Sequence, residues 1–394
     1  MIKAQRPQLF NISILLMVSG ILSLVGCTDN NSQPIRKADN VKSIENTTEK
    51  TIDNTFSKAS NRVPAARFDM SHWKLTLPTD SDLDGKVDDI TNEELQNYVH
   101  DNFFYVDELG HLVFTAPNKG GTTKNSHNTR SELRYLSTND PSVNSHDPRN
   151  NFAIASHPNA DQFASIGGKM EVTMHVDHAP RNSNKPNQSS SYAAVIGQIH
   201  AIKYKERPID GFGYGNEPLK IMYKKWPNHK TGSIYWNYER NLAKDNPDRT
   251  DISYVVWGNS RKDPADPGEQ GIALGEDFSY TVNVYKDTMY LTFENPRLGK
   301  VHHQINLSNN VDANGVIDTK DNPQGYIGDG NYFKAGVYNQ CRAVPKKGET
   351  EGRCPGTGDW AIDKANGDYA QVSFSKLLVS GADAKKSSAF KQSQ

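Results

Sequence analysis

Cysteine is scarce in this chain, and an excess of charge of either sign is lacking. Three cysteines occur in 394 residues, and 45 lysines and arginines nearly balance 46 aspartates and glutamates. No run of lysine and arginine suits a nucleic acid, so this class of partner is excluded. Neither the cysteines nor the histidines have the spacing of a metal motif. Any affinity for a polyanion must therefore come from a local cluster of cations.

The apolar run near the start is too short for a permanent membrane span. Lys3 and Arg6 precede an apolar stretch at 9–24, which falls short of the ~20 residues that a span needs. A basic start followed by a short apolar core is typical of a bacterial export signal. The small residues before Cys27 resemble a lipobox, which predicts that residues 1–26 are removed and Cys27 is lipidated. We therefore expect an exported lipoprotein of the outer membrane or cell surface; a periplasmic or secreted protein with an ordinary signal peptide is the alternative.

The rest of the chain divides by composition. Residues 27–66 are rich in Asn, Ser, Thr and Lys and hold almost no large apolar side chains, which predicts a flexible tether. Residues 67–382 are expected to form one domain, followed by a polar tail at 383–394. Cys341 and Cys354 are expected to form a disulfide, because export permits one and the segment between them is polar. Two free thiols are the alternative.

Short alternating segments dominate this domain. In residues 169–177 apolar and polar side chains alternate with period two, which is typical of a strand with one buried face. Similar strands are predicted at 112–114, 191–200, 219–224, 233–238, 252–257, 280–286, 289–294, 332–340 and 369–379. Only residues 92–100 suggest a helix. Many strands with few helices predict an all-β sandwich or jelly roll.

Three of the short segments concentrate polar chemistry on one strand face. In the first, 130–134, the alternation places Arg130, Glu132 and Arg134 on the same side. In the second, 198–200, Gln198 and His200 share a face that Ile199 does not. The third, 332–340, presents on one face the side chains of Tyr332, Lys334, Tyr338 and Gln340. Together they supply guanidiniums, an ammonium, amides, an imidazole and phenols, which suit an anionic sugar.

Each segment taken alone also fits a plainer interpretation. The charged alternation at 130–134 is typical of a solvated sheet face, His200 of a hydrogen-bonding residue at a strand end, and Tyr338 of a half-buried aromatic. In sequence order, however, the three segments resemble the signature motifs of the family 7 polysaccharide lyases, the alginate lyases of jelly-roll fold. Those motifs read approximately R-[ST]-E-L-R, Q-[IV]-H and Y-F-K-A-G-x-Y-x-Q, and all three occur here without a mismatch.

The resemblance spans roughly residues 68–379 and includes 73–78, which is similar to the family's opening strand. It implies a β-jelly roll of two antiparallel sheets with a concave substrate cleft. It also implies an enzyme that depolymerises alginate by β-elimination and needs no cofactor. In that reaction a base removes the proton on carbon 5 of a uronate and the bond from carbon 4 to the bridging oxygen breaks. The carboxylate beside carbon 5 must be neutralised for this to happen, and arginine binds a carboxylate bidentately.

The resemblance implies a catalytic set of Arg130, Gln198, His200 and Tyr338. Arg130 and Gln198 neutralise the carboxylate, His200 is the base for guluronate, and Tyr338 donates a proton to the leaving oxygen. For mannuronate, Tyr338 serves as both base and acid. The residues expected to orient the substrate or the catalytic groups are Glu132, Arg134, Lys334, Gln340, Tyr332 and Asn339.

Smaller features of the sequence bear on which polysaccharide is the substrate and on which other functions remain possible. The resemblance implies, through Ile199 in the second motif, a lean toward guluronate-containing blocks. A lyase of another polyuronate and a non-catalytic carbohydrate-binding jelly roll remain alternatives, whereas a retaining glycoside hydrolase would need a pair of close carboxylates that no strand supplies. We expect a monomer whose partner is the anionic polysaccharide, and which meets a membrane only through its lipid anchor.

A structural calcium site is the weakest of the expectations. Asp80, Asp82 and Asp84 are spaced as in a calcium loop, with Gly85 at the turn. The twelfth position, which should be a bidentate glutamate, is Thr91, so the ligand set is incomplete. A solvated acidic loop is the alternative interpretation.

Overall fold

The computed structural model describes residues 62–203 and 213–384, which all belong to one unit, Asn54–Gln394. The predicted export signal, the lipidation site at Cys27, almost all of the tether and most of the tail lie outside the described residues. No helix of the described part is both long and apolar enough to pass through a membrane.

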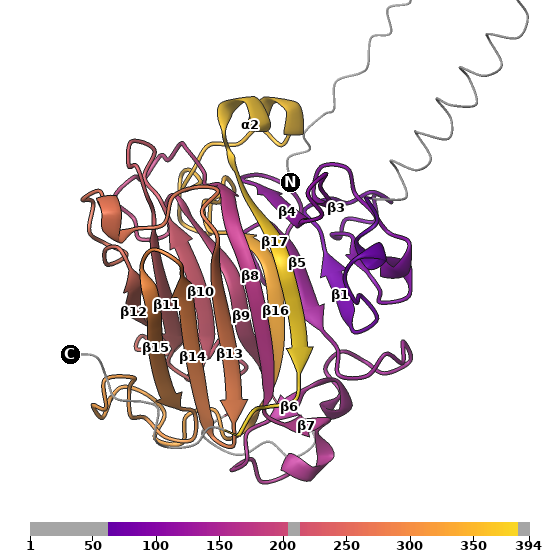
Figure 1. Ribbon diagram of the computed structural model, residues 1–394, viewed down its shortest axis with the longest axis vertical. Coiled ribbons are helices and arrows are strands. Elements are labelled where there is room, and N and C mark those ends of the chain that lie inside the picture. Colours follow the sequence, from indigo (N-terminus) through magenta and orange to yellow (C-terminus); the bar gives the residue numbers. More distant parts are fainter. Residues whose placement is uncertain (1–61, 204–212, 385–394) are drawn as a thin grey trace, which may run out of the picture. The chain divides into compact units, whose positions relative to one another are not determined.

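Two stacked sheets form the domain, with the seven-stranded sheet in front of the ten-stranded one in Figure 1. The ten-stranded sheet has the order β12 (Asp251–Trp257), β11 (Ser233–Glu239), β10 (Leu219–Lys224), β9 (Ala193–Lys203), β16 (Asp329–Asn339), β5 (Arg130–Tyr135), β1 (Trp73–Thr76), β2 (Asp89–Ile90), with β6 (Phe152–Ala153) and β7 (Ser165–Ile166) attached beside β16. The seven-stranded sheet has the order β15 (Gly299–Asn306), β14 (Thr288–Asn295), β13 (Phe278–Tyr285), β8 (Gly168–His178), β17 (Tyr369–Ser380), β4 (Leu112–Pro117), β3 (Phe104–Val106). Within the described residues every strand pair is antiparallel except β6–β7. The predicted sandwich of two antiparallel sheets is confirmed.

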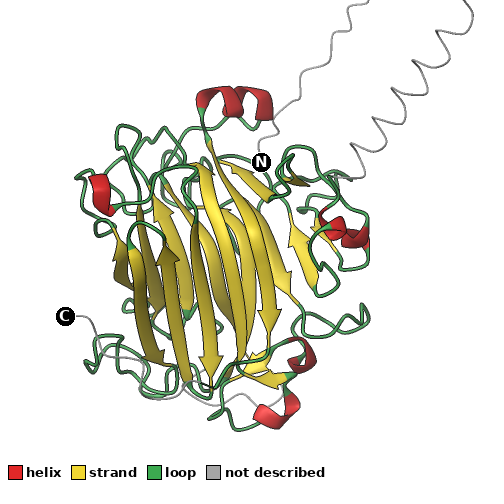
Figure 2. Cartoon of the chain, viewed as in Figure 1, coloured by secondary structure: helices red, strands yellow, loops and turns green. Residues whose placement is uncertain are grey.

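Helices are few and short in the part of the chain that the structure describes (Figure 2). The 3₁₀ turns are η1 (Pro64–Ala66), η2 (Glu94–Gln96), η3 (Pro148–Asn150), η4 (Ala160–Gln162) and η5 (Gly268–Gln270), and α2 (Trp360–Asn366) is a single α-helix. The helix predicted at 92–100 is wrong, because only the turn η2 forms there. Helix α2 begins where Asp359 accepts from the backbone N–H groups of Ala361 and Ile362.

The core lies between the two sheets because alternate residues of each strand point inward. Leu133, Ile199 and Phe333 from the ten-stranded sheet belong to the same buried cluster as Val172 and Leu291 from the seven-stranded sheet. All five are at most 1% exposed. The strands therefore present their other, polar residues on the outer face of the ten-stranded sheet, as the period-two pattern predicts.

The cysteine prediction is confirmed within the described residues. Cys341 and Cys354 form a disulfide with a Cα–Cα distance of 5.3 Å and a sequence separation of 13. Cys341 lies two residues after the end of β16. The guanidinium of Arg353 donates to the carbonyl of Gln340 at 3.1 Å, so the bridged loop is also tied to the strand by a hydrogen bond.

Candidate active site

The three predicted segments lie on three adjacent strands. Strand β16 pairs with β9 on one side and with β5 on the other. Its residue Lys334 stands opposite both Gln198 and Arg134, while Tyr338 stands opposite Arg130. The register therefore brings side chains that are more than a hundred residues apart in sequence onto one sheet face.

Gly336 permits this arrangement. It faces Glu132 across the β16–β5 pair with φ +132°, in a region that favours glycine. A Cβ at this position would stand 2.5 Å from the carbonyl oxygen of Ser131. The pairing of β16 with β9 shifts between Ala335 and Tyr338, so the strand bulges beside the site.

Glu132 is the centre of a buried cluster of donors. Its Oε2 accepts from Arg130 Nη1 at 3.1 Å and from the Lys334 ammonium, and its Oε1 accepts from the Gln198 amide. Glu132 is 2% exposed and Gln198 is 1% exposed. Burial alone would raise the pKa of Glu132, but the charges of Lys334 and Arg130 outweigh burial and lower it. The carboxylate therefore stays ionised and holds the three donors in place.

Arg130 keeps a free donor despite this contact. Its guanidinium carbon lies 4.1 Å from the centroid of the Tyr338 ring. Among the described residues its buried Nε atom has no hydrogen-bond partner. Burial alone would lower the pKa of Arg130, but Tyr338 and Glu132 raise it, so the group stays charged. An unpaired N–H of a guanidinium that stays charged can donate to a carboxylate of the substrate.

A second chain of contacts leads to His200. The guanidinium carbon of Arg134 lies 3.9 Å from the centroid of the Tyr332 ring. The His200 ring stacks on the same tyrosine at 5.4 Å between centroids and an interplanar angle of 13°. His200 Nε2 lies 3.2 Å from Oε1 of Glu217, just before β10. Tyr332 is 8% exposed, so it orients its neighbours more than it meets a ligand.

The last two predicted residues, at the end of β16, have different surroundings. Gln340 is partly exposed, and its amide donates to the Tyr338 carbonyl at 3.3 Å. Asn339 is 1% exposed, and its amide donates to the Ala116 carbonyl at 3.1 Å and to Asn118. Its Oδ1 accepts from the N–H of Cys341. The placement of Asn339 argues against its predicted role in substrate binding, since alternation turns it to the other side of the strand.

Comparison with known proteins gives a consistent result. Residues 68–381 match the sequence pattern of the alginate lyase family. An alginate lyase of Klebsiella pneumoniae is 32% identical over 293 residues, which cover 72% of this chain and 86% of that relative. The chain belongs to the alginate lyase family.

Two solved structures of alginate lyases have the same fold. The enzyme of Klebsiella pneumoniae aligns with a TM-score of 0.62 and 29% identity over 81% of this chain and 99% of its own. The exolytic family 7 alginate lyase AlyA5 of Zobellia galactanivorans aligns with a TM-score of 0.64 and 32% identity over 82% of this chain and all of its own. The protein is therefore an alginate lyase of the β-jelly-roll class, as its three motifs predicted.

The sequence did not identify two polar partners of the site in this alginate lyase. Glu217 meets His200, and the hydroxyl of Ser126 lies 3.0 Å from the phenol oxygen of Tyr338. Both residues lie in polar loops that precede a strand. In these loops the sequence has no alternation of apolar and polar residues from which a contact could be predicted. The only available signal was that Glu217 lies two residues before the predicted strand 219–224. This position would place it close to the end of whichever strand pairs with 219–224.

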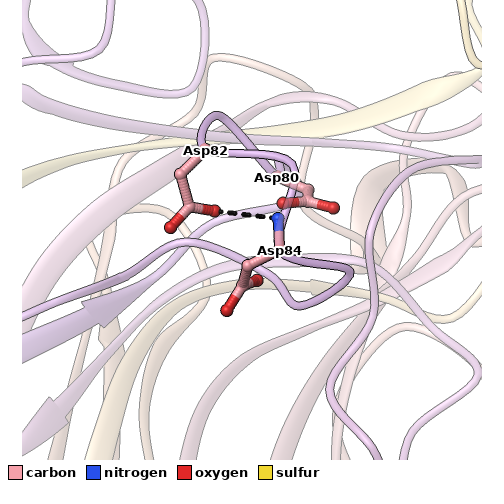
Figure 3. Close-up of side chains that lie close together, drawn as sticks. All are labelled: Asp80, Asp82 and Asp84. Carbon is pink, nitrogen blue, oxygen red and sulfur yellow. Dashed lines mark hydrogen bonds between the residues drawn. The ribbon is translucent and has the colours of Figure 1, made fainter.

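Figure 3 shows the acidic turn of the lyase, with the side chains of Asp80, Asp82 and Asp84 close together. One oxygen from each of Asp80, Asp82 and Asp84 lies within 4.8 Å of the others. The turn is also held by its own bonds: the N–H of Asp84 donates to Asp82 at 3.3 Å, and the N–H of Gly85 donates to Asp80 at 3.1 Å. The Lys86 ammonium donates to Asp84 and so competes with a cation. The carboxylates are grouped as the sequence predicted, and calcium binding stays a prediction.

Proposed function

We propose that this alginate lyase cleaves its substrate by β-elimination and prefers guluronate-containing blocks. The observation that carries the proposal is the buried Nε of Arg130, which has no hydrogen-bond partner among the described residues and belongs to a guanidinium that lies over the Tyr338 ring. A uronate carboxylate that accepts from this N–H loses much of its charge, which makes the neighbouring carbon 5 proton easier to remove. A donor aimed at charge that develops in the reaction contributes about 3 kcal/mol.

The division of labour between base and acid has support in the strand register. His200 stands opposite Tyr332, whereas Tyr338 lies six residues further along β16, opposite Arg130. The cluster around Glu132 lies between them. For guluronate the proton and the leaving oxygen lie on opposite ring faces, so a base and an acid that flank the sugar suit this epimer. For mannuronate Tyr338 performs both steps, because proton and leaving oxygen lie on the same side.

Ile199 gives no direct contact that would explain the preference for guluronate. It is fully buried in the core between the sheets, so it faces away from the sugar. The preference therefore depends on the positions of Gln198 and His200, its two neighbours in β9.

Catalysis in this proposal requires no cofactor. Arg130, Lys334 and the Gln198 amide supply the positive charge and donors that a metal supplies in other enzymes. We therefore expect full activity in the presence of a chelator. Calcium at Asp80, Asp82 and Asp84 would act only on the stability of the turn.

The reaction type is tested by incubating the enzyme with alginate and following both ultraviolet absorbance and reducing ends. β-Elimination leaves a conjugated double bond at the new end, so the two signals should rise together. Reducing ends without absorbance would indicate hydrolysis and would refute the proposal. Defined guluronate and mannuronate blocks, compared at equal concentration, test the preference.

We also propose that the enzyme is an exported monomer that is anchored by a lipid on Cys27. The support is the basic start, the short apolar stretch at 9–24 and the cysteine that follows. The disulfide between Cys341 and Cys354 suits an oxidising compartment. A Cys27→Ser variant should move from the membrane fraction to the soluble fraction and lose incorporation of labelled fatty acid. Light scattering tests the monomer.

A further inference from the structure

Both ring nitrogens of His200 face hydrogen-bond acceptors. Nδ1 lies 2.8 Å from the carbonyl oxygen of Ala201, and Nε2 lies 3.2 Å from Oε1 of Glu217. A carbonyl oxygen can only accept, so Nδ1 carries a proton. An ionised carboxylate can only accept as well. The carboxylate beside Nε2 therefore favours the imidazolium, the form that His200 takes once it has accepted a proton.

Glu217 is ionised in these surroundings. Its other oxygen lies 3.6 Å from the ammonium of Lys220, which also contacts Asp251 at 2.8 Å and Glu239 at 3.5 Å. Burial alone would raise the pKa of Glu217, but the charges of Lys220 and His200 outweigh burial and hold that pKa well below its usual value. The carboxylate is thus a fixed negative charge directed at the imidazole.

The orientation of the imidazole is restricted from three sides. Nδ1 is bonded to the backbone, one ring face lies against Tyr332, and Nε2 is directed toward Glu217. With Nδ1 occupied, Nε2 is the nitrogen that can accept the carbon 5 proton. Glu217 therefore acts on the same nitrogen that the reaction uses.

We propose that Glu217 is a positioning residue that orients His200 and stabilises the imidazolium formed when His200 acts as the base. This inference rests on the proposed function. In the reaction, neutral His200 takes the carbon 5 proton on Nε2, and the electrons of that C–H bond form the double bond between carbons 4 and 5. The bond from carbon 4 to the bridging oxygen breaks, and that oxygen leaves with a proton from Tyr338. His200 afterwards releases its proton to solvent, and Tyr338 regains one.

The inference distinguishes the two epimers of the substrate. Glu217 should matter where His200 is the base, on guluronate, and far less where Tyr338 is both base and acid, on mannuronate. Among the described residues, the charged and titratable groups that face the His200 ring are Glu217 with Lys220 behind it, and Tyr332 with Arg134 over its ring. Glu217 is the one among these that contacts a ring nitrogen.

The experiment compares Glu217→Gln with Asp251→Asn on guluronate and mannuronate blocks. Asp251→Asn is the matched control, because it removes a carboxylate from the same Lys220 without touching His200. In Glu217→Gln, kcat on guluronate blocks should fall on the order of 10²-fold, since the base loses its orientation. Activity on mannuronate blocks should stay near that of the wild type.

Nuclear magnetic resonance of ¹⁵N-labelled histidine gives a second readout that does not depend on turnover. At the same neutral pH, the ¹⁵N chemical shift of His200 Nε2 should differ between the wild type and Glu217→Gln, because Nε2 loses the carboxylate beside it, whereas the shift of Nδ1 should stay the same. Unchanged guluronate turnover in Glu217→Gln, an equal loss in Asp251→Asn, or an equal loss on both block types overturns the inference. If His200→Ala keeps its guluronate activity, the proposed function fails instead, whatever Glu217→Gln does.

Discussion

The guanidinium carbon of Arg130 lies 4.1 Å above the ring of Tyr338, across the pair formed by β5 and β16. One edge of the same guanidinium is held by Glu132, and its Nε has no partner within the described residues. Arg130, the cation that neutralises the uronate, thus contacts Tyr338, whose phenol donates a proton to the leaving oxygen. Both groups therefore act on the same bond of the polymer.

Arg130→Lys should lower kcat more than it raises KM. Lysine keeps the charge but loses the planar group that stacks on Tyr338 and donates from two sides. The expected loss in kcat is about 10²-fold, as for removal of one donor from a site where charge develops. Steady-state kinetics on alginate measure it, and an unchanged turnover number would contradict the assigned role. Circular dichroism confirms that the variant is folded.

KM should rise as the pH increases through about 8, the pKa of Lys334. Burial lowers this pKa, Arg130 lowers it further, and Glu132 opposes both. Below this value the ammonium is charged and adds to the attraction for a uronate; above it the charge is lost. The neutral variant Lys334→Met should show a high KM at all pH values and no inflection there. An identical inflection in that variant would assign the titration to another group.

His175, on β8 of the other sheet, should stabilise the protein in a pH-dependent way. Asp177 raises its pKa to about 9 against the effect of burial, and Asp277 adds to the rise. A raised pKa stabilises the folded state fully below the unfolded value, and this stabilisation is lost as the pH rises through about 9. His175→Gln should lower the free energy of unfolding by on the order of 1 kcal/mol near pH 6. Urea unfolding above pH 9 should show little difference, and a constant difference would exclude this mechanism.

Loss of the disulfide should destabilise the lyase without abolishing catalysis. A bridge that closes a loop of this length contributes about 3 kcal/mol in the chain-entropy model. The double variant Cys341→Ala with Cys354→Ala should unfold at lower denaturant concentration, and a reductant should have no further effect on it. Wild-type stability in the double variant would show that the bridge is dispensable.

The sequence predicted the sandwich and the catalytic strands because both follow from alternation. Arg130, Glu132 and Arg134 share a face, as do Gln198 and His200, and the core residues Leu133 and Ile199 take the opposite one. Those patterns depend only on the period of a strand. Asn339 was misplaced for a related reason: its position in the motif was read as a role, although alternation directs it away from the site.

Other features could not be predicted because they depend on partners far away in the chain. The edge strand β15 was missed, since most of its residues are at least partly exposed and the apolar period is weak. Helix α2 has only seven residues, too few to give a helical period. The contact between Glu217 and His200 follows from the pairing of β9 with β10, in which Leu219 stands opposite Ile199. No local pattern encodes which strands pair or in which register.

The central claim is that Tyr338 and His200 divide the elimination on guluronate, whereas Tyr338 alone serves mannuronate. The direct test is the ultraviolet absorbance produced by His200→Ala and Tyr338→Phe on separate guluronate and mannuronate blocks. We expect Tyr338→Phe to lose almost all activity on both, and His200→Ala to lose it on guluronate only, while both still bind alginate. Substantial turnover by Tyr338→Phe on either block would contradict the account.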